Sequence, residues 1–263
     1  MDQEREKVIK SFRLFDDVFM KKCFKNHKEC IELVVRIVLN NDNLKFVEFK
    51  DQDNLGNEKG KSSILDFVIV DDTGKFYDVE IESAKSNSKG YQRRARFYSS
   101  LLDTHYLSKG DDYENIPDSY VIFFCERDVI GDGKPLYEIR NTVRQTGKAF
   151  EDGRTMIFVN GEIEDDTPLG RLVRDFKLTN SKEMCYDVLK KAVEVEMIDF
   201  LLTTGRPENQ ILDDYLKKHE DAAVAKNNKK IAKKAIEEGY SLESISRITD
   251  IPIEELTKLK QQL

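Results

Sequence analysis

The sequence of 263 residues contains no tryptophan, three histidines and four cysteines. No two cysteines form a CxxC pair, and their spacing is unlike that of small secreted domains, so we expect reduced thiols in a cytoplasmic protein. No apolar run approaches the ~18–20 residues that cross a membrane. The opening segment, MDQERE, also lacks the apolar centre of a signal peptide.

Several catalytic signatures are missing as well. No G-x-S-x-G segment occurs, and no serine or cysteine has a recognisable nucleophile context. The segment 56–62 resembles a phosphate-binding P-loop, but it is one residue short and precedes a predicted strand instead of a helix. We therefore interpret it as an ordinary loop.

Acidic residues outnumber basic ones by 50 to 43, which gives a formal net charge of −7. This balance argues against a protein that coats nucleic acid by bulk charge, but it allows an enzyme with a local basic surface. Hydrophobic residues make up 39% of the chain, which is too many for a disordered protein. The length suits one large domain, or one domain with an appendage.

Helical and strand patterns divide the chain. Strands are predicted at residues 44–49, 64–70, 75–82, 119–125 and 155–159. The strand at 119–125 is almost continuously apolar, which predicts a central place in the sheet. Helices are predicted in the first forty residues, at 169–176 and 182–202, and in the tail from about residue 208, and residues 85–107 are predicted to form a loop and a long helix. This order indicates an α/β core, residues 1–205, with a helical C-terminal tail, residues 206–263.

A hairpin is predicted from the strands 64–70 and 75–82, joined by a turn at 71–74. Side chains alternate across a strand, so one face of the second strand carries three carboxylates: Asp78, Glu80 and Glu82. If the turn is centred on Thr73, Asp66 in the first strand lies opposite Glu80 on the same face. A shift of the register by one residue would place them on opposite faces.

This group of carboxylates predicts a metal site. Neighbouring carboxylates repel one another, and burial disfavours their charged form. A divalent cation would stabilise them, and hard oxygen ligands on rigid strands suit Mg²⁺ or Mn²⁺. The alternative is a solvated acidic face of an edge hairpin. That alternative is stronger for Asp78 and Glu82 than for Asp66, which has apolar neighbours on both sides.

A basic segment follows the hairpin directly. Between residues 85 and 96 the chain has five cations and no acid, with aromatic residues interleaved. The candidate nucleic-acid contacts are Lys85, Lys89, Arg93, Arg94, Arg96 and Tyr98. Cations beside an acidic metal site suit an enzyme that cleaves phosphodiesters, because they can hold the backbone phosphates. A solvated helix face is the alternative.

Three segments resemble the PD-(D/E)XK nuclease family transposases, also called recombination-promoting nucleases: ILDF at 64–67, GKFYDVEIE at 74–82 and RRARFY at 93–98. The resemblance continues through the strand at 120–125 and the tail at 239–259. It implies a restriction-endonuclease-like α/β fold with a mixed sheet flanked by helices. It also implies Mg²⁺-dependent cleavage of DNA, in bacterial proteins linked to mobile elements and recombination.

The resemblance assigns roles to the hairpin residues. In the family pattern Asp66 is the first metal ligand and Glu80 the second. The third catalytic position is usually lysine or glutamine, and here it is Glu82. A lysine can orient the attacking water and offset negative charge in the transition state, which a carboxylate cannot do. Glu82 could instead ligate the metal or accept a proton, and Lys85 could supply the missing cation. Ile64 is a second departure, at a position where the family commonly has arginine.

Cys23, His27 and Cys30 stand at a spacing that could place them on one helix face. Zinc would need a fourth ligand, and no nearby residue is an obvious one. We therefore interpret the two cysteines as packed helix residues.

Breaks at residues 239–241 and 250–252 divide the tail into short predicted helices. Two short helices around a turn could form a helix-turn-helix that reads DNA. Glu254 and Glu255 stand where DNA contact would be expected. We therefore favour an accessory or self-association element, through which the protein could form a homo-oligomer.

The sequence thus predicts a metal-dependent DNA endonuclease in which Asp66 and Glu80 bind Mg²⁺. Two alternatives stay open. The chain could keep the nuclease fold and bind DNA or a partner without turnover, because Glu82 replaces the usual residue. It could also be an acidic interaction module whose hairpin carboxylates are solvated.

Overall fold

The computed structural model describes residues 3–50, 66–83, 88–106, 110, 112–203 and 210–263. These residues form two compact units, one of Ile9–Asp199 and one that combines residues 1–8 with Phe200–Leu263. The predicted boundary at 205/206 stays a proposal, because residues 204–209 lie outside the described part. Among the described helices, none is long and apolar enough to cross a membrane.

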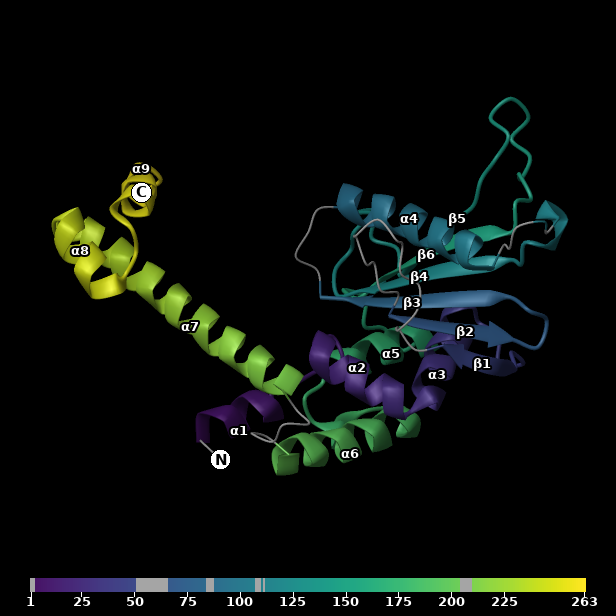
Figure 1. The fold of residues 1–263 in the computed structure, drawn as a ribbon, viewed down its shortest axis with the longest axis horizontal. Coiled ribbons are helices and arrows are strands. Elements are labelled where there is room, and N and C mark those ends of the chain that lie inside the picture. Colours follow the sequence, from purple (N-terminus) through teal and green to yellow (C-terminus); the bar gives the residue numbers. More distant parts are fainter. Residues whose placement is uncertain (1–2, 51–65, 84–87, 107–109, 111, 204–209) are drawn as a thin grey trace. The chain divides into compact units, whose positions relative to one another are not determined.

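A mixed sheet forms the centre of the larger unit (Figure 1). Its strands follow the order β1-β2-β3-β4-β6-β5. The neighbours β1, β2 and β3 are antiparallel, β3, β4 and β6 are parallel, and β5 returns antiparallel to β6. The bounds are β1 (Phe46–Lys50), β2 (Phe67–Asp71), β3 (Phe76–Glu82), β4 (Ser119–Cys125), β5 (Leu136–Ile139) and β6 (Arg154–Asn160). The apolar strand β4 lies inside the sheet between β3 and β6, as predicted.

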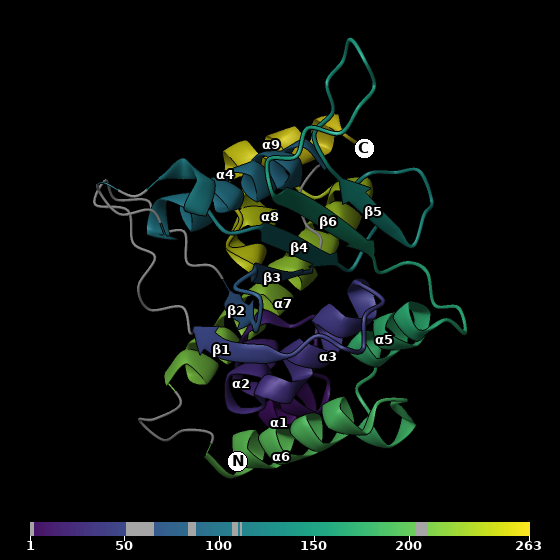
Figure 2. The same ribbon diagram turned by 90° about the vertical axis from the view of Figure 1, so that its right-hand side faces the viewer.

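Helices cover both faces of the sheet (Figure 2). On one face lie α2 (Asp17–Asn26), α3 (Lys28–Val38) and α5 (Pro168–Lys177), and on the other lies α4 (Ser88–Tyr106). Aromatic rings join the first set to the strands. The Phe24 ring of α2 lies 5.7 Å from that of Phe67, and the Phe176 ring of α5 lies 4.4 Å from that of Phe124. The residues that α4 packs against the other face include Tyr91, Ala95, Tyr98 and Leu102.

The second unit has a small core of its own. Its last three helices are α7 (Gln210–Glu237), α8 (Leu242–Thr249) and α9 (Ile253–Gln261), and they bury Ala232, Ile245, Ile251 and Leu256 together. Ser241 caps α8 by accepting a hydrogen bond from the Ser244 N–H, and Asp250 ends it in a left-handed conformation. The predicted breaks in the tail are therefore confirmed.

Other predicted elements shift or were missed. The strand β5 was missed, because its four residues at the sheet edge are largely half-exposed and show no clear alternation. The helix predicted at 182–202 is α6 (Asp187–Thr203), which begins after a 3₁₀ turn at Ser181–Glu183. A further 3₁₀ turn spans Tyr113–Asn115, and α1 spans Gln3–Lys10. The P-loop-like segment 56–62 lies outside the described residues.

Candidate active site

The β2–β3 hairpin has the register that the sequence predicts. Phe67 pairs with Val79 and Val70 with Phe76, so the pairing is centred on Thr73. Asp71 holds this turn: its side chain accepts hydrogen bonds from the backbone N–H groups of residues 73 and 75, from the Thr73 hydroxyl and from the Tyr77 hydroxyl. Local hydrogen bonds in the turn therefore determine which side chains meet further along the hairpin.

Asp66 and Glu80 meet where this register places them. Asp66 directly precedes β2, and its backbone N–H donates to Glu80 Oε1 over 2.8 Å. Because β2 and β3 are antiparallel, Asp66 lies near the carboxyl end of β3, which is also the carboxyl end of the parallel strand β4. The carboxyl ends of parallel strands are a common location of active sites in α/β proteins.

The acidic face of β3 is buried, not solvated. The strand lies inside the sheet between β2 and β4, and both Asp78 and Glu80 are 0% exposed. The solvated-edge interpretation is therefore wrong for Asp78, because it assumed an edge hairpin. Glu82, at the end of the strand, keeps 18% of its side chain exposed and is paired with Arg94. Because Asp78 and Glu80 are buried, the alternative of an acidic interaction module with solvated hairpin carboxylates loses its support.

Asp78 has no hydrogen-bond partner for either carboxylate oxygen among the described residues. A hydrogen bond with the neighbouring Glu80 carboxyl would require a proton on one of the two groups. A buried acidic group without a donor is energetically unfavourable, so it indicates either protonation or a missing positive charge.

Arg94 of α4 contacts two of the carboxylates. Its Nη2 donates to Glu80 Oε2 over 2.9 Å, and its Nη1 pairs with Glu82 Oε1. Its Nε donates to the Tyr98 hydroxyl over 3.0 Å, and the guanidinium lies 5.1 Å from the centre of that ring. The basic helix thus places one arginine against the acidic strand.

Lys21 is a site residue that the sequence patterns did not identify. It lies on α2, and its Nζ is 3.2 Å from Asp66 Oδ1 and 2.8 Å from Asp17 Oδ1. The spacing of Asp17 and Lys21 indicates an ion pair along the helix, but no local signal links either residue to Asp66.

The pKa values of the buried acids are shifted upward. Burial raises the pKa of Asp66, and the charge of Lys21 opposes the rise. Burial and the charges of Asp78 and Asp66 raise the pKa of Glu80 well above its usual range. Burial and the charge of Asp66 do the same for Asp78. The protein's own cations therefore compensate these acids incompletely.

The donor chemistry fits Mg²⁺ or Mn²⁺, although the described His, Cys, Asp and Glu side chains do not converge in a group of three or more that could hold a metal ion. Carboxylate oxygens on rigid strands are suitable ligands for these cations. Five carboxyl groups here contact or adjoin two cations, which leaves three surplus negative charges if all are ionised: Asp17, Asp66, Asp78, Glu80 and Glu82 against Lys21 and Arg94. One divalent cation would balance two of these charges.

The predicted nucleic-acid contacts separate into groups. Arg93 and Arg96 are exposed on α4. Tyr98 instead lies in the core, 5% exposed, with its ring stacked on Phe123 at 6.0 Å, so burial keeps it from a surface contact with DNA. Lys85 and the side chain of Lys89 lie outside the described part.

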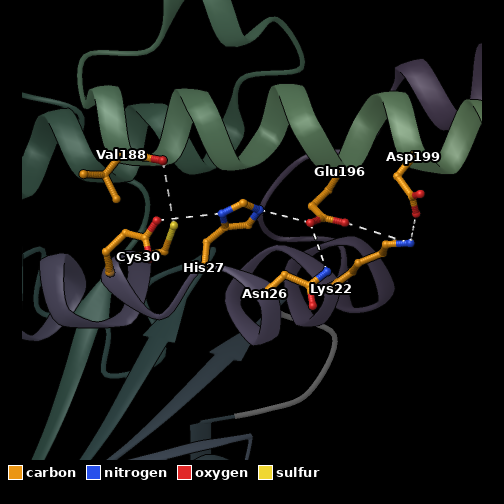
Figure 3. Close-up of polar contacts among 8 residues, drawn as sticks. Lys22, Asn26, His27, Cys30, Val188, Glu196 and Asp199 are labelled. Atoms are coloured by element: carbon orange, nitrogen blue, oxygen red, sulfur yellow. Dashed lines mark hydrogen bonds and ion pairs between the residues drawn. The ribbon is translucent and has the colours of Figure 1, made fainter. Parts of the chain in front are cut away.

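The cysteines of α2 and α3 are packed in the interior. Cys23 and Cys30 are fully buried, and burial raises the pKa of both thiols, which disfavours the thiolate form that zinc binds. His27 contacts Glu196 of α6 at 3.0 Å instead (Figure 3). Glu196 also accepts a hydrogen bond from Asn26, so this polar group joins α6 to the helices that flank the sheet.

The fold agrees with the comparison to known families. The model of a family described as PD-(D/E)XK nuclease family transposase matches residues 14–164, which is more than half of the chain. No curated protein and no solved structure matches the chain. The matched segment includes α2, the β2–β3 hairpin, α4 and β6, and the mixed sheet with flanking helices is consistent with a restriction-endonuclease-like α/β fold. The chain therefore belongs to the PD-(D/E)XK nuclease family transposases.

Proposed function

We propose that this protein is a metal-dependent DNA endonuclease of the recombination-promoting type. The observation that carries the proposal is the buried pair of Asp66 and Glu80, joined by a 2.8 Å hydrogen bond at one end of the sheet. A nuclease family and an adjoining basic helix support DNA as the substrate. The resemblance implies a bacterial protein and the sequence predicts reduced thiols, so we expect this activity in the cytoplasm of a bacterial cell.

Asp66 and Glu80 would hold Mg²⁺ or Mn²⁺ through their carboxylate oxygens. When bound, such a cation supplies Lewis acidity toward the phosphate and makes water a stronger nucleophile. In the reaction, the oxygen of water bonds to phosphorus, one phosphorus–oxygen ester bond breaks, and the departing oxygen takes up a proton. The products are a phosphate monoester and an alcohol.

Glu82 would have an altered role in this site. Its carboxylate pairs with Arg94, whose guanidinium also contacts Glu80. In this chain the polar group beside Glu80 therefore comes from α4, whereas family members commonly carry a lysine or glutamine at position 82. Arg93 and Arg96, which are exposed on α4, would bind the DNA backbone, and Lys89 stays a predicted contact. These contacts position the duplex and make binding sensitive to salt.

A second candidate is a nuclease-fold protein that binds DNA without cleaving it. The acidic Glu82 favours this candidate, because no lysine or glutamine stands at the third catalytic position. The tail, proposed as residues 206–263, would serve self-association or another accessory role in either case.

Plasmid nicking tests the proposal. Purified protein is incubated with supercoiled plasmid and Mg²⁺ or Mn²⁺, beside Asp66→Ala and Asp66→Asn. An exposed acid of the hairpin turn supplies the matched control, Asp72→Asn. We expect nicking by the wild type and the control but not by the Asp66 variants. Absence of nicking with either metal, or equal nicking by the Asp66 variants, contradicts the nuclease proposal.

Binding and reversion separate the two candidates. DNA binding by a wild type that does not nick would support the second candidate. A gain of nicking in Glu82→Lys would show that position 82 limits the activity.

A further inference from the structure

Lys21 reaches Asp66 from the face of the sheet opposite α4 (Figure 2). The helix α2 packs on the face opposite α4, where Phe24 meets Phe67 of β2. Asp66 lies just before Phe67, at the end of the strand, where a side chain from either face can approach it. The packing of α2 therefore determines the position of the Lys21 ammonium, 3.2 Å from Asp66 Oδ1.

The Lys21 ammonium has a donor to spare. An ammonium carries three N–H groups, and Lys21 directs two of them to Asp17 and Asp66 among the described residues. Its side chain is 37% exposed, so part of it faces the solvent from which a substrate would approach.

Arg94, the other cation of the site, makes a contact through each of its three nitrogens. Its Nη2, Nη1 and Nε are directed to Glu80, Glu82 and Tyr98 respectively. Two of its five N–H groups stay outside these contacts, and 38% of its side chain is exposed, so Arg94 also keeps donors. Lys21 differs from Arg94 in that it lies against Asp66, the first proposed metal ligand.

We propose that Lys21 is a catalytic residue, whose Nζ donates a hydrogen bond to a non-bridging oxygen of the scissile phosphate and offsets its growing negative charge. Lys21 thereby performs, from α2, part of the role that the acidic residue at position 82 cannot perform. No bond to Lys21 forms or breaks during the hydrolysis. The proposal rests on the nuclease function proposed above.

A purely structural role makes different predictions. If Lys21 only neutralises Asp66, a bound divalent cation replaces that effect, and saturating metal restores full activity to a variant without the charge. If Lys21 contacts the phosphate, saturating metal leaves the defect in place. The nicking rate at saturating Mn²⁺ and the affinity for Mn²⁺ must therefore be measured separately.

Lys21→Gln is the main variant, because its amide can keep the hydrogen bonds to Asp17 and Asp66 while the charge is lost. Lys22→Gln is the matched control, since Lys22 is the next residue on α2 and also pairs with carboxylates, Glu196 and Asp199 of α6 (Figure 3). Lys21→Arg tests rescue by a retained positive charge. Mn²⁺ affinity is measured by isothermal titration calorimetry, and nicking rates are compared below the melting temperature of every variant.

We expect Lys21→Gln to nick about 10²–10³-fold more slowly at saturating Mn²⁺, as for loss of one donor to a transition-state oxyanion. Its Mn²⁺ affinity should be unchanged or tighter, because a positive charge beside Asp66 is gone. Lys21→Arg should recover part of the rate, and Lys22→Gln should nick at the wild-type rate.

Two results would contradict the proposed role of Lys21 and leave the nuclease proposal intact. One is a Lys21→Gln rate equal to that of Lys22→Gln at saturating Mn²⁺. The other is a loss of Mn²⁺ affinity that accounts for the whole loss of rate. A wild type that does not nick at all contradicts the nuclease function itself, and the role of Lys21 with it.

Discussion

The backbone N–H of Asp66 donates to the side chain of Glu80, so the main chain at one proposed metal ligand orients the carboxylate of the other. The second oxygen of Glu80 accepts from Arg94. This arrangement depends on the hairpin register, since a shift of one residue would remove the backbone donor and turn the Asp66 side chain away. The turn that determines the register is therefore part of what makes the site.

Asp71→Ala should destabilise the protein by about 2–3 kcal/mol, because the turn loses hydrogen bonds to a buried carboxylate from the backbone N–H of Thr73 and the hydroxyl of Tyr77. Urea unfolding measures the change. The control is Asp72→Ala, at an exposed neighbour in the same turn, which should stay within about 0.5 kcal/mol of the wild type. Equal effects of the two substitutions would show that Asp71 does not hold the turn.

The contribution of Asp71 also depends on pH. Burial favours a higher pKa, but the hydrogen bonds, that from Tyr77 first, outweigh it and lower the pKa of Asp71 below its ordinary value of 3.8. A depressed pKa stabilises the fold above the unfolded pKa, and this stability is lost as pH falls through the folded pKa. The stability difference between wild type and Asp71→Asn should therefore shrink below about pH 4. A difference that is constant down to acid unfolding would contradict this account.

Asp78→Val should stabilise the metal-free protein by about 1–3 kcal/mol, because it removes a buried carboxyl group without a described partner. The new side chain would lie between two valines, Val68 and Val121, which pair with position 78 on the neighbouring strands. Thermal unfolding in the presence of a chelator measures the effect. Asp78→Asn, which keeps the polar atoms, should gain less. A loss of stability in Asp78→Val would show that the carboxyl group has a stabilising partner.

Arg94→Met should lower stability by about 1–3 kcal/mol, because Glu80 and Glu82 lose their shared cation. The effect should be smaller than for a fully buried pair, since 38% of the Arg94 side chain is exposed and water screens the charges. Arg93→Met, at the exposed neighbouring position, is the control for urea unfolding. Added Mn²⁺ should recover part of the lost stability. Identical unfolding curves for the two variants would show that Arg94 does not stabilise the fold by neutralising Glu80 and Glu82.

Arg93→Gln combined with Arg96→Gln should weaken DNA binding without changing the melting temperature, because both side chains are exposed. Each lost phosphate contact should reduce the slope of log affinity against log salt by about 0.9. Fluorescence anisotropy with a short labelled duplex measures this slope. Arg144→Gln, at another exposed arginine, should leave it unchanged. An unaltered slope in the double variant would place the DNA elsewhere on the protein.

Leu256→Ala should destabilise the three-helix tail by about 2–5 kcal/mol, because Leu256 is fully buried in its small core. Hydrogen exchange should accelerate in α8 and α9 and stay unchanged in β3 and β4. Acceleration of the same size in all four elements would show that the two units unfold together, against the proposed domain division.

Several features follow from local sequence alone. The turn at 71–74 and the alternation of β3 predict the hairpin register, because hydrogen bonds between near neighbours determine both. The ends of α8 are likewise local, since they depend on a capping serine and a left-handed residue. The pairing of Asp66 with Glu80 could be predicted for the same reason.

Burial and long-range contacts could not be predicted in this way. The acidic pattern of β3 looks the same on a solvated edge as in an inner strand, and only the strand order and the cover by α4 bury Asp78. Likewise, the partner of Arg94 depends on how α4 lies over the sheet.

The sequence by itself determined the hairpin, its carboxylate pair and the basic segment that follows, because each arises from residues close together in the chain. Only the tertiary structure decided which cation meets which acid. Lys21 reaches Asp66 because α2 packs Phe24 against Phe67, the first residue of the strand that follows Asp66. Such a contact depends on the packing of distant elements, and no spacing within either segment encodes it.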